Sequence, residues 1–163
     1  MNALTRRVGK QCLNYNKMNR MALVNTPSRG IKLHEYQAGQ LLDSFKVAIP
    51  LGEVAFTPEE AHKIASKFDN GCVVKSQILG GGRGMGFIKE TGFQGGVKLV
   101  DTADQAKAIA KEFLGNRLVT KQSGEDGLPV NCVYLVQKIN IAKEMYLSLT
   151  LDRAAGMPVF VYS

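Results

Sequence analysis

The sequence contains no tryptophan, only two histidines and three cysteines among its 163 residues, and no long apolar run. Cys12, Cys72 and Cys132 lie far apart and form neither a Cys-x-x-Cys pair nor a spacing typical of metal ligands. We therefore expect buried, inert thiols in a reducing compartment. No apolar stretch approaches the roughly 18 residues that span a bilayer. The sequence thus predicts a soluble chain that has no membrane as a partner.

Acidic residues are absent from the first 30 residues, which hold six of the 21 basic ones. The rest of the chain has 15 basic and 14 acidic residues and is nearly neutral. A basic patch on the folded part is therefore not expected, which excludes nucleic acid as a partner. Apolar residues mixed with Arg and Lys, without Asp or Glu, are typical of a mitochondrial transit peptide. Residues 1–30 are predicted to be such a leader, and a disordered basic tail is the alternative.

Strands that alternate with helices and are followed by a hairpin predict a mixed α/β or α+β domain over residues 31–163. Thr57 and Thr102 are expected to begin helices, with Glu60 and Gln105 as their capping-box partners. The expected helices cover residues 33–45, 58–68 and 103–114. The expected strands cover residues 54–56, 72–77, 97–100, 118–120, 133–138, 145–151 and 158–162. Because the sequence stops at Ser163 directly after an apolar run, we expect a further element to follow.

A glycine-rich loop over residues 79–86 follows the expected strand 72–77. Without Cβ atoms, its backbone N–H groups can approach an anion closely, which suits phosphate. It is not a Walker A loop, because no Gly-Lys-Ser/Thr closes it, and it lacks the Gly-x-Gly-x-x-Gly fingerprint of dinucleotide-binding domains. A mobile surface hairpin is the alternative.

Two cations flank this loop and are candidates for one polyphosphate site. Lys75 ends the expected strand, and Arg83 lies eight residues later within the loop. A point charge and a bidentate guanidinium together suit phosphate oxygens. The alternatives are a lysine that extends to solvent and a solvated loop arginine. Glu144 is a candidate acceptor for ribose hydroxyls, or else a surface partner of Lys143 or Lys138.

Six stretches of the chain resemble, in order and spacing, the β subunit of succinate–CoA ligases. They are Leu33-His34-Glu35-Tyr36-Gln37, Val73-Val74-Lys75-Ser76-Gln77, Gly81-Gly82-Arg83-Gly84, Gly95-Gly96-Val97, Leu118-Val119-Thr120-Lys121-Gln122 and Ala142-Lys143-Glu144-Met145-Tyr146-Leu147. The resemblance implies a partial ATP-grasp fold, with a mixed β-sheet and flanking helices, in the amino-terminal portion of that subunit. The residues that match the family's nucleotide-binding positions are Lys75, Gly82, Arg83, Gly84, Gln137, Asn140 and Glu144.

The resemblance also implies an activity and a location. The family interconverts succinyl-CoA, a nucleoside diphosphate and phosphate with succinate, CoA and the triphosphate, in the tricarboxylic acid cycle. It does so as a heterodimer with an α subunit, in the mitochondrial matrix or a related organelle. Pro50 occupies a position where ATP-preferring members have proline, so ATP/ADP is favoured over GTP/GDP. The family's Mg²⁺ ligands and its succinate- and CoA-facing domain lie beyond the position of Ser163, so we expect the 163 residues alone to be inactive.

Two departures from the family pattern favour a second hypothesis. Met85 replaces the usual lysine of the glycine loop. Gln137 replaces a glutamate that is common in the family's hinge, the segment matching Gln137 to Asn140 that holds the base. A short non-catalytic protein that binds nucleotide or assists assembly is therefore the alternative to a ligase subunit. A different ATP-grasp ligase would share the cleft but not the opening Leu33-His34-Glu35-Tyr36-Gln37. No catalytic or metal-ligating residue is assigned, since His34 and His62 have no acidic or cysteine partner at a catalytic spacing.

Overall fold

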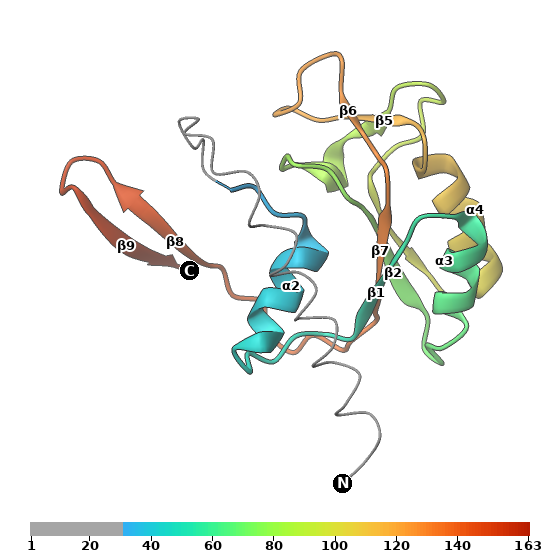
Figure 1. Cartoon of the computed structure of the whole chain (residues 1–163), viewed down its shortest axis with the longest axis horizontal. Coiled ribbons are helices and arrows are strands. Elements are labelled where there is room, and N and C mark those ends of the chain that lie inside the picture. Colours follow the sequence, from blue (N-terminus) through green and yellow to red (C-terminus); the bar gives the residue numbers. More distant parts are fainter. Residues whose placement is uncertain (1–30) are drawn as a thin grey trace, which may run out of the picture. The chain divides into compact units, whose positions relative to one another are not determined.

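The structure is a computed structural model that describes residues 31–163 (Figure 1). The predicted leader, residues 1–30, lies outside the described residues, and so does Cys12. The elements are α2 (Glu35–Ser44), β1 (Gly52–Ala55), α3 (Pro58–Ala65), β2 (Cys72–Ser76), the 3-10 turn η1 (Arg83–Met85), β3 (Phe87–Ile88), β4 (Val97–Val100), α4 (Ala103–Phe113), β5 (Arg117–Val119), β6 (Leu128–Pro129), β7 (Val133–Gln137), β8 (Leu147–Asp152) and β9 (Met157–Tyr162). Among the helices of this part, none is long and apolar enough to cross a membrane.

The central sheet has four strands in the order β1-β7-β2-β4. All its neighbouring strands are antiparallel, so β1 and β2 run parallel to each other on either side of β7. In the same way, β4 and β7 run parallel on either side of β2. α3 joins the first parallel pair and α4 lies on the path between the second, which gives two interlocked split β-α-β units. The α+β class is confirmed, while neighbouring strands in the described part are antiparallel and not mixed in direction.

The core lies between the sheet and the helices α3 and α4, which pack side by side on one face (Figure 1). Small buried residues on both helices, among them Ala61 and Ala106, allow this close approach. Val74 from β2, Leu135 from β7 and Phe113 from α4 fill the space below and are fully buried. Their burial stabilises the domain by about 25 cal/mol for each Å² of apolar surface removed from water.

The cap of α3 confirms the predicted helix start and corrects its details. The Thr57 hydroxyl accepts a hydrogen bond from the Glu60 N–H at 3.1 Å. The Glu60 carboxylate, however, accepts from the N–H of Phe56, one residue before the cap, at 2.8 Å. The cap of α4 is arranged in the same way: the Thr102 hydroxyl accepts from the Gln105 N–H, and the Gln105 side chain accepts from the N–H of Asp101, one residue before the cap. α3 ends at Ala65 and not near Phe68, because hydrogen bonds between residues three apart tighten its last turn.

Smaller elements complete the described chain. β3, β5 and β6 form a second antiparallel sheet. The short elements β3, β6 and η1 were not predicted, since two- and three-residue elements show no periodicity.

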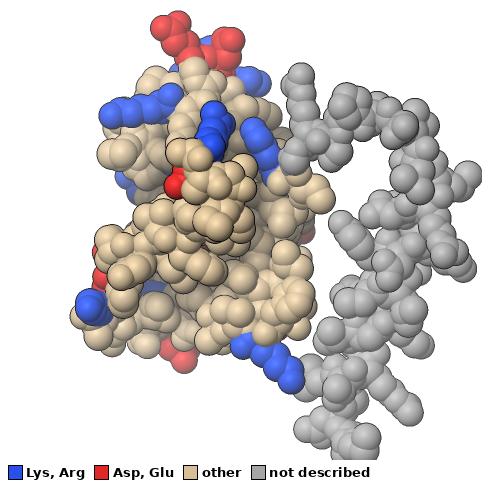
Figure 2. All heavy atoms as spheres, turned by 90° about the vertical axis from the view of Figure 1, so that its left-hand side faces the viewer, with Lys and Arg blue, Asp and Glu red and all other residues tan. Residues whose placement is uncertain are grey.

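The predicted hairpin is confirmed as β8–β9, in which one face is apolar throughout. That face carries Leu147, Leu149, Leu151, Pro158, Phe160 and Tyr162. The side of the molecule that carries this hairpin and α2 has few charged side chains (Figure 2).

Candidate nucleotide site

The alternation of side chains along β2 decides where Lys75 lies. Val74 faces the core under α3 and α4, so Lys75 lies on the opposite face of the sheet, toward α2. In the β-ladder Lys75 is directly opposite Tyr134 of β7. The Tyr134 ring is tilted against the ring of Tyr36 on α2, with 6.4 Å between the centroids. Lys75 therefore lies beside the Tyr134 ring in the same pocket, and Tyr36 packs against that ring.

Glu35, the first residue of α2, joins the two candidate phosphate ligands. Its Oε1 accepts a hydrogen bond from Lys75 Nζ at 2.8 Å, and its Oε2 accepts one from Arg83 Nη2 at 2.7 Å. The side chains of Lys75, Arg83 and Glu35 are 25%, 20% and 33% exposed. Lys75 does not extend to solvent and Arg83 is not a freely solvated charge, so both alternatives for these cations are wrong. The structure brings the two residues together around one carboxylate.

The charges of this cluster change the acidity of Glu35. Burial by itself raises the pKa of the carboxyl group. The hydrogen bonds and positive charges of Lys75 and Arg83 together outweigh burial and hold the pKa of Glu35 below its ordinary value of 4.5. The carboxylate is therefore ionised at neutral pH, and the cluster carries one net positive charge.

The glycine loop forms backbone hydrogen bonds with the turn at Gly95 and Gly96, so it is not a free hairpin. The Gly96 N–H donates to the carbonyl oxygen of Arg83 at 2.7 Å, and the Gly95 N–H donates to that of Gly86 at 2.7 Å. Gly82 has φ of 77°, a left-handed conformation in which a side chain would be strained. Within the described residues, the N–H groups of Gly82, Arg83 and Gly84 have no hydrogen-bond acceptor. These donors are available for an anion.

A pocket of about 240 Å³ lies between α2 and the sheet, beside the cluster. Its lining residues are Glu35, Ala38, Gly39, Leu42, Ile49, Pro50, Lys75, Tyr134 and Val136. Most of this wall is apolar, and the charged groups are confined to Glu35 and Lys75. The structure therefore brings the base-specificity candidate Pro50 and the phosphate candidate Lys75 into one pocket.

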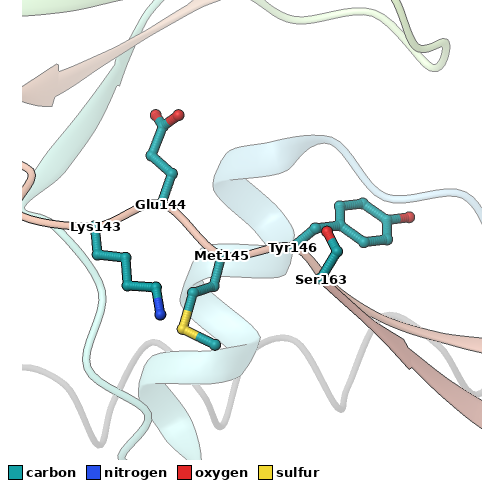
Figure 3. Close-up of a pocket in the computed structure, with 5 residues that line it drawn as sticks. All are labelled: Lys143, Glu144, Met145, Tyr146 and Ser163. Carbon is teal, nitrogen blue, oxygen red and sulfur yellow. The ribbon is translucent and has the colours of Figure 1, made fainter.

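The other predicted site residues lie elsewhere. Gln137 ends β7, where its N–H donates to the carbonyl oxygen of Leu51 at 2.8 Å, and Asn140 is exposed on the segment that follows. Glu144 lies at a second, open hollow of about 630 Å³ lined by Lys143, Glu144, Met145, Tyr146 and Ser163 (Figure 3). There the Glu144 side chain points to the opposite side of the backbone from Lys143 and Met145. The structure does not bring Glu144 into the pocket of Lys75.

The alternative role of Glu144, as a surface ion-pair partner of Lys143 or Lys138, is not observed either. Among the described residues Glu144 forms no ion pair, and Lys138 lies 3.4 Å from Asp101 instead. Glu35 is the site residue that sequence reasoning missed. The available signal was electrostatic, because two partly buried cations at one place require a counter-charge.

The cysteines and histidines of the described part do not contact the cluster of Lys75, Arg83 and Glu35 through any hydrogen bond or ion pair between side chains. Cys72 and Cys132 are buried free thiols, as predicted, and burial raises the pKa of Cys72 to about 11. A thiol with so high a pKa forms little of the reactive thiolate at neutral pH. His62 lies 3.3 Å from Asp104 on the surface. Among residues 31–163, no group of three or more His, Cys, Asp or Glu is placed to hold a metal ion.

The chain is similar in sequence to known proteins. The chain is 47% identical over 136 residues to the mitochondrial β subunit of an ADP-forming succinate–CoA ligase from Dictyostelium discoideum, covering 83% of this chain and 30% of that protein. The mitochondrial β subunit from Saccharomyces cerevisiae is 39% identical over 154 residues, covering 94% and 36%. The hydrogenosomal one from Neocallimastix frontalis is 45% identical over 136 residues, covering 83% and 31%.

The chain thus spans about a third of the length of the curated relatives it matches. The family model of the ATP-grasp domain matches residues 32–163, which is all but one of the residues that the structure describes. The expected fold family is therefore confirmed. Because of this match, the chain belongs to the ATP-grasp domain family, and its two interlocked split β-α-β units carry Lys75 and the glycine loop.

Proposed function

We propose that this chain binds a nucleoside di- or triphosphate as the amino-terminal, nucleotide-binding portion of a succinate–CoA ligase β subunit. The observation that carries the proposal is the convergence of Lys75 and Arg83 on one carboxylate beside a largely apolar pocket. Two cations held within reach of two oxygens of one anion suit a phosphate group. The names of the similar proteins support the ligase and ADP as the favoured nucleotide.

Each group then has a defined part in binding. Lys75 and Arg83 neutralise phosphate oxygens. The N–H groups of Gly82 and Gly84, which have no acceptor in residues 31–163, donate to the same anion. Ile49 and Pro50 form the apolar wall against which a flat base packs. The hinge from Gln137 to Asn140 supplies backbone groups at the edge of the base. A contact between Glu144 and the ribose requires the segment that follows β7 to move, since Glu144 lies at a different hollow.

The complete reaction is proposed for the whole assembly and not for these 163 residues. In that assembly an α subunit exchanges a phosphoryl group with the nucleotide bound here, in the reversible conversion of succinyl-CoA to succinate within the tricarboxylic acid cycle. Phosphoryl transfer requires Mg²⁺ to neutralise developing charge, and residues 31–163 hold no cluster that fits a metal ion. We infer that the chain alone binds nucleotide without turning it over, in a mitochondrial matrix or a related organelle.

The exposed Met85 supports a second candidate function. This side chain is 82% exposed at the rim of the glycine loop, where the family commonly has a lysine. A short non-catalytic protein that binds or assembles through the same cleft would tolerate that loss. Intact-mass measurement of the native protein separates the two. A species of the size of the relatives supports the ligase subunit, and one of the size of residues 31–163 supports the short protein.

The test of nucleotide binding is thermal stabilisation of the chain by millimolar ADP or ATP. A ligand at about 100 times its Kd adds about 2.7 kcal/mol to the free energy of unfolding, which raises Tm measurably. We expect this shift in the wild type and its loss in Lys75→Ala with Arg83→Ala. The matched control removes two surface cations, Lys67→Ala with Lys107→Ala, and retains the shift. An unchanged shift in the first double variant overturns the proposed site.

A further inference from the structure

The two candidate phosphate ligands are already occupied by an anion that belongs to the chain itself. Each oxygen of the Glu35 carboxylate accepts a hydrogen bond from a different cation, Oε1 from Lys75 and Oε2 from Arg83. These are the contacts that two oxygens of one phosphate would make. One terminal nitrogen of Arg83 donates to the Ser76 carbonyl at 2.7 Å and the other donates to Glu35. Each terminal nitrogen carries a second N–H, but a phosphate can take the shared position between Arg83 and Lys75 only by displacing the Glu35 carboxylate.

We propose that Glu35 is an internal competitor that a phosphate must displace from Lys75 and Arg83, and that it thereby sets which anions the site accepts. The inference rests on the proposed binding of nucleotide phosphates at these cations. Two cations and one carboxylate leave a single net positive charge, and a carboxylate that stays repels any incoming phosphate. An anion of low charge gains little by replacing Glu35, whereas a polyphosphate gains several charged contacts at once. Glu35 thus favours polyphosphates over singly charged anions.

The arrangement allows the side chain of Glu35 to leave without disturbing the cations. The backbone at the start of α2 is tied to the sheet, because the Tyr36 N–H donates to the buried Gln77 side chain at 3.4 Å. Arg83 keeps its bond to the Ser76 carbonyl in either case. Only the side chain of Glu35 has to rotate, and the amino terminus of α2 remains a favourable place for its charge. Displacement is therefore a local change with few lost contacts.

The test measures binding of inorganic pyrophosphate, inorganic phosphate and ADP to the full chain by calorimetry. Glu35→Gln keeps the size of the side chain but removes its charge, and we expect pyrophosphate to bind about tenfold tighter, equivalent to about 1.4 kcal/mol. We expect the wild type to bind inorganic phosphate weakly and the variant to gain more than tenfold for it, so the preference for the polyphosphate shrinks. The matched control is Glu53→Gln, which neutralises a carboxylate paired with Lys67 on the surface and leaves all three affinities unchanged.

The outcomes separate this inference from the proposed function. Tighter pyrophosphate binding by Glu35→Gln supports it, even if ADP does not bind to either protein, in which case only the nucleotide function fails. Equal or weaker binding shows that Glu35 organises the cations and does not compete, and it overturns the inference while ADP binding by the wild type still stands. Glu35→Asp, whose shorter side chain reaches the cations less well, is expected to be intermediate. That variant decides the matter if Glu35→Gln fails to fold.

Discussion

The Ser76 hydroxyl donates a hydrogen bond to the carbonyl oxygen of Gly96 at 2.8 Å, and the Ser76 N–H donates to the same oxygen at 2.9 Å. Ser76 is the last residue of β2, directly after Lys75, and it is fully buried. Gly96 in turn donates its N–H to the Arg83 carbonyl oxygen. The Ser76–Gly96 contact therefore links the strand that carries one cation to the loop that carries the other, and so fixes their separation.

Gly96→Ala is expected to destabilise the fold at this junction. A Cβ at residue 96 would lie 2.5 Å from the Ser76 Oγ and 2.6 Å from a methyl carbon of Leu118. Both neighbours are fully buried and have little room to retreat. Overpacking of this kind costs about 1–3 kcal/mol, and the measurement is the midpoint of urea-induced unfolding. An unchanged midpoint would contradict the packing described around Ser76.

Gly84→Ala is the matched control for this substitution. No atom lies within 4 Å of a Cβ built at Gly84, so stability should stay within about 0.5 kcal/mol of the wild type. If the loop approaches a phosphate, the same methyl group obstructs the anion and weakens ADP binding. Gly96→Ala should therefore lower stability, and Gly84→Ala should lower affinity at nearly unchanged stability.

The ion pairs of Glu35 predict a specific acid sensitivity. Because the pKa of Glu35 is lower in the folded protein than its ordinary value of 4.5, the ionised group stabilises the fold. That contribution is complete above pH 4.5 and is lost as pH falls through the folded pKa, where the carboxylate becomes protonated. We expect the difference in unfolding free energy between the wild type and Glu35→Gln to be largest at neutral pH and to vanish in acid.

Chemical denaturation at a series of pH values measures this difference. Glu53→Gln serves as the control, since its carboxylate pairs with Lys67 where both side chains are 49% exposed. Such surface pairs contribute about 0–1 kcal/mol, so its profile should parallel that of the wild type. A constant offset between the wild type and Glu35→Gln at every pH would contradict the assigned linkage.

Pro50→Gln is expected to move nucleotide preference from adenine toward guanine. Pro50 lines the same pocket as Lys75, and its ring has no donor on this wall. A glutamine side chain adds a donor and an acceptor, and one hydrogen bond to a base edge contributes about 0.5–1.5 kcal/mol, or about two- to tenfold in affinity. The measurement is the ratio of the Kd values for ADP and GDP. An unchanged ratio would place the base elsewhere.

Much of the fold follows from local signals in the sequence. The threonine caps at Thr57 and Thr102 predict where two helices begin, because their hydroxyls satisfy N–H groups of the first turn. Apolar alternation predicts the strands of the central sheet and the hairpin. The order of those strands and the two-residue strands could not be predicted, since they depend on pairings between segments that are far apart along the chain.

The site was predicted only in part, because local signals again report some of its residues and not others. Two cations separated by several glycines predict an anion-binding site at Lys75 and Arg83. Their shared partner Glu35 lies 40 residues before Lys75 and 48 before Arg83, a separation that no local pattern reports. The separation of Glu144 from this cluster depends on the path of the chain after β7, which composition and spacing do not determine.

Tyr134 lines the pocket, and Tyr36 packs against its ring, so tyrosine absorbance and emission can report on this pocket. The chain has no tryptophan and five tyrosines, so the weaker emission of tyrosine is not masked. Burial raises the pKa of both phenols, and the negative charge of Glu35 raises that of Tyr134 further. A ligand that displaces the carboxylate from Lys75 changes the field at the Tyr134 ring. Tyrosine emission and ultraviolet difference absorbance can therefore follow the occupation of this pocket in the unlabelled protein.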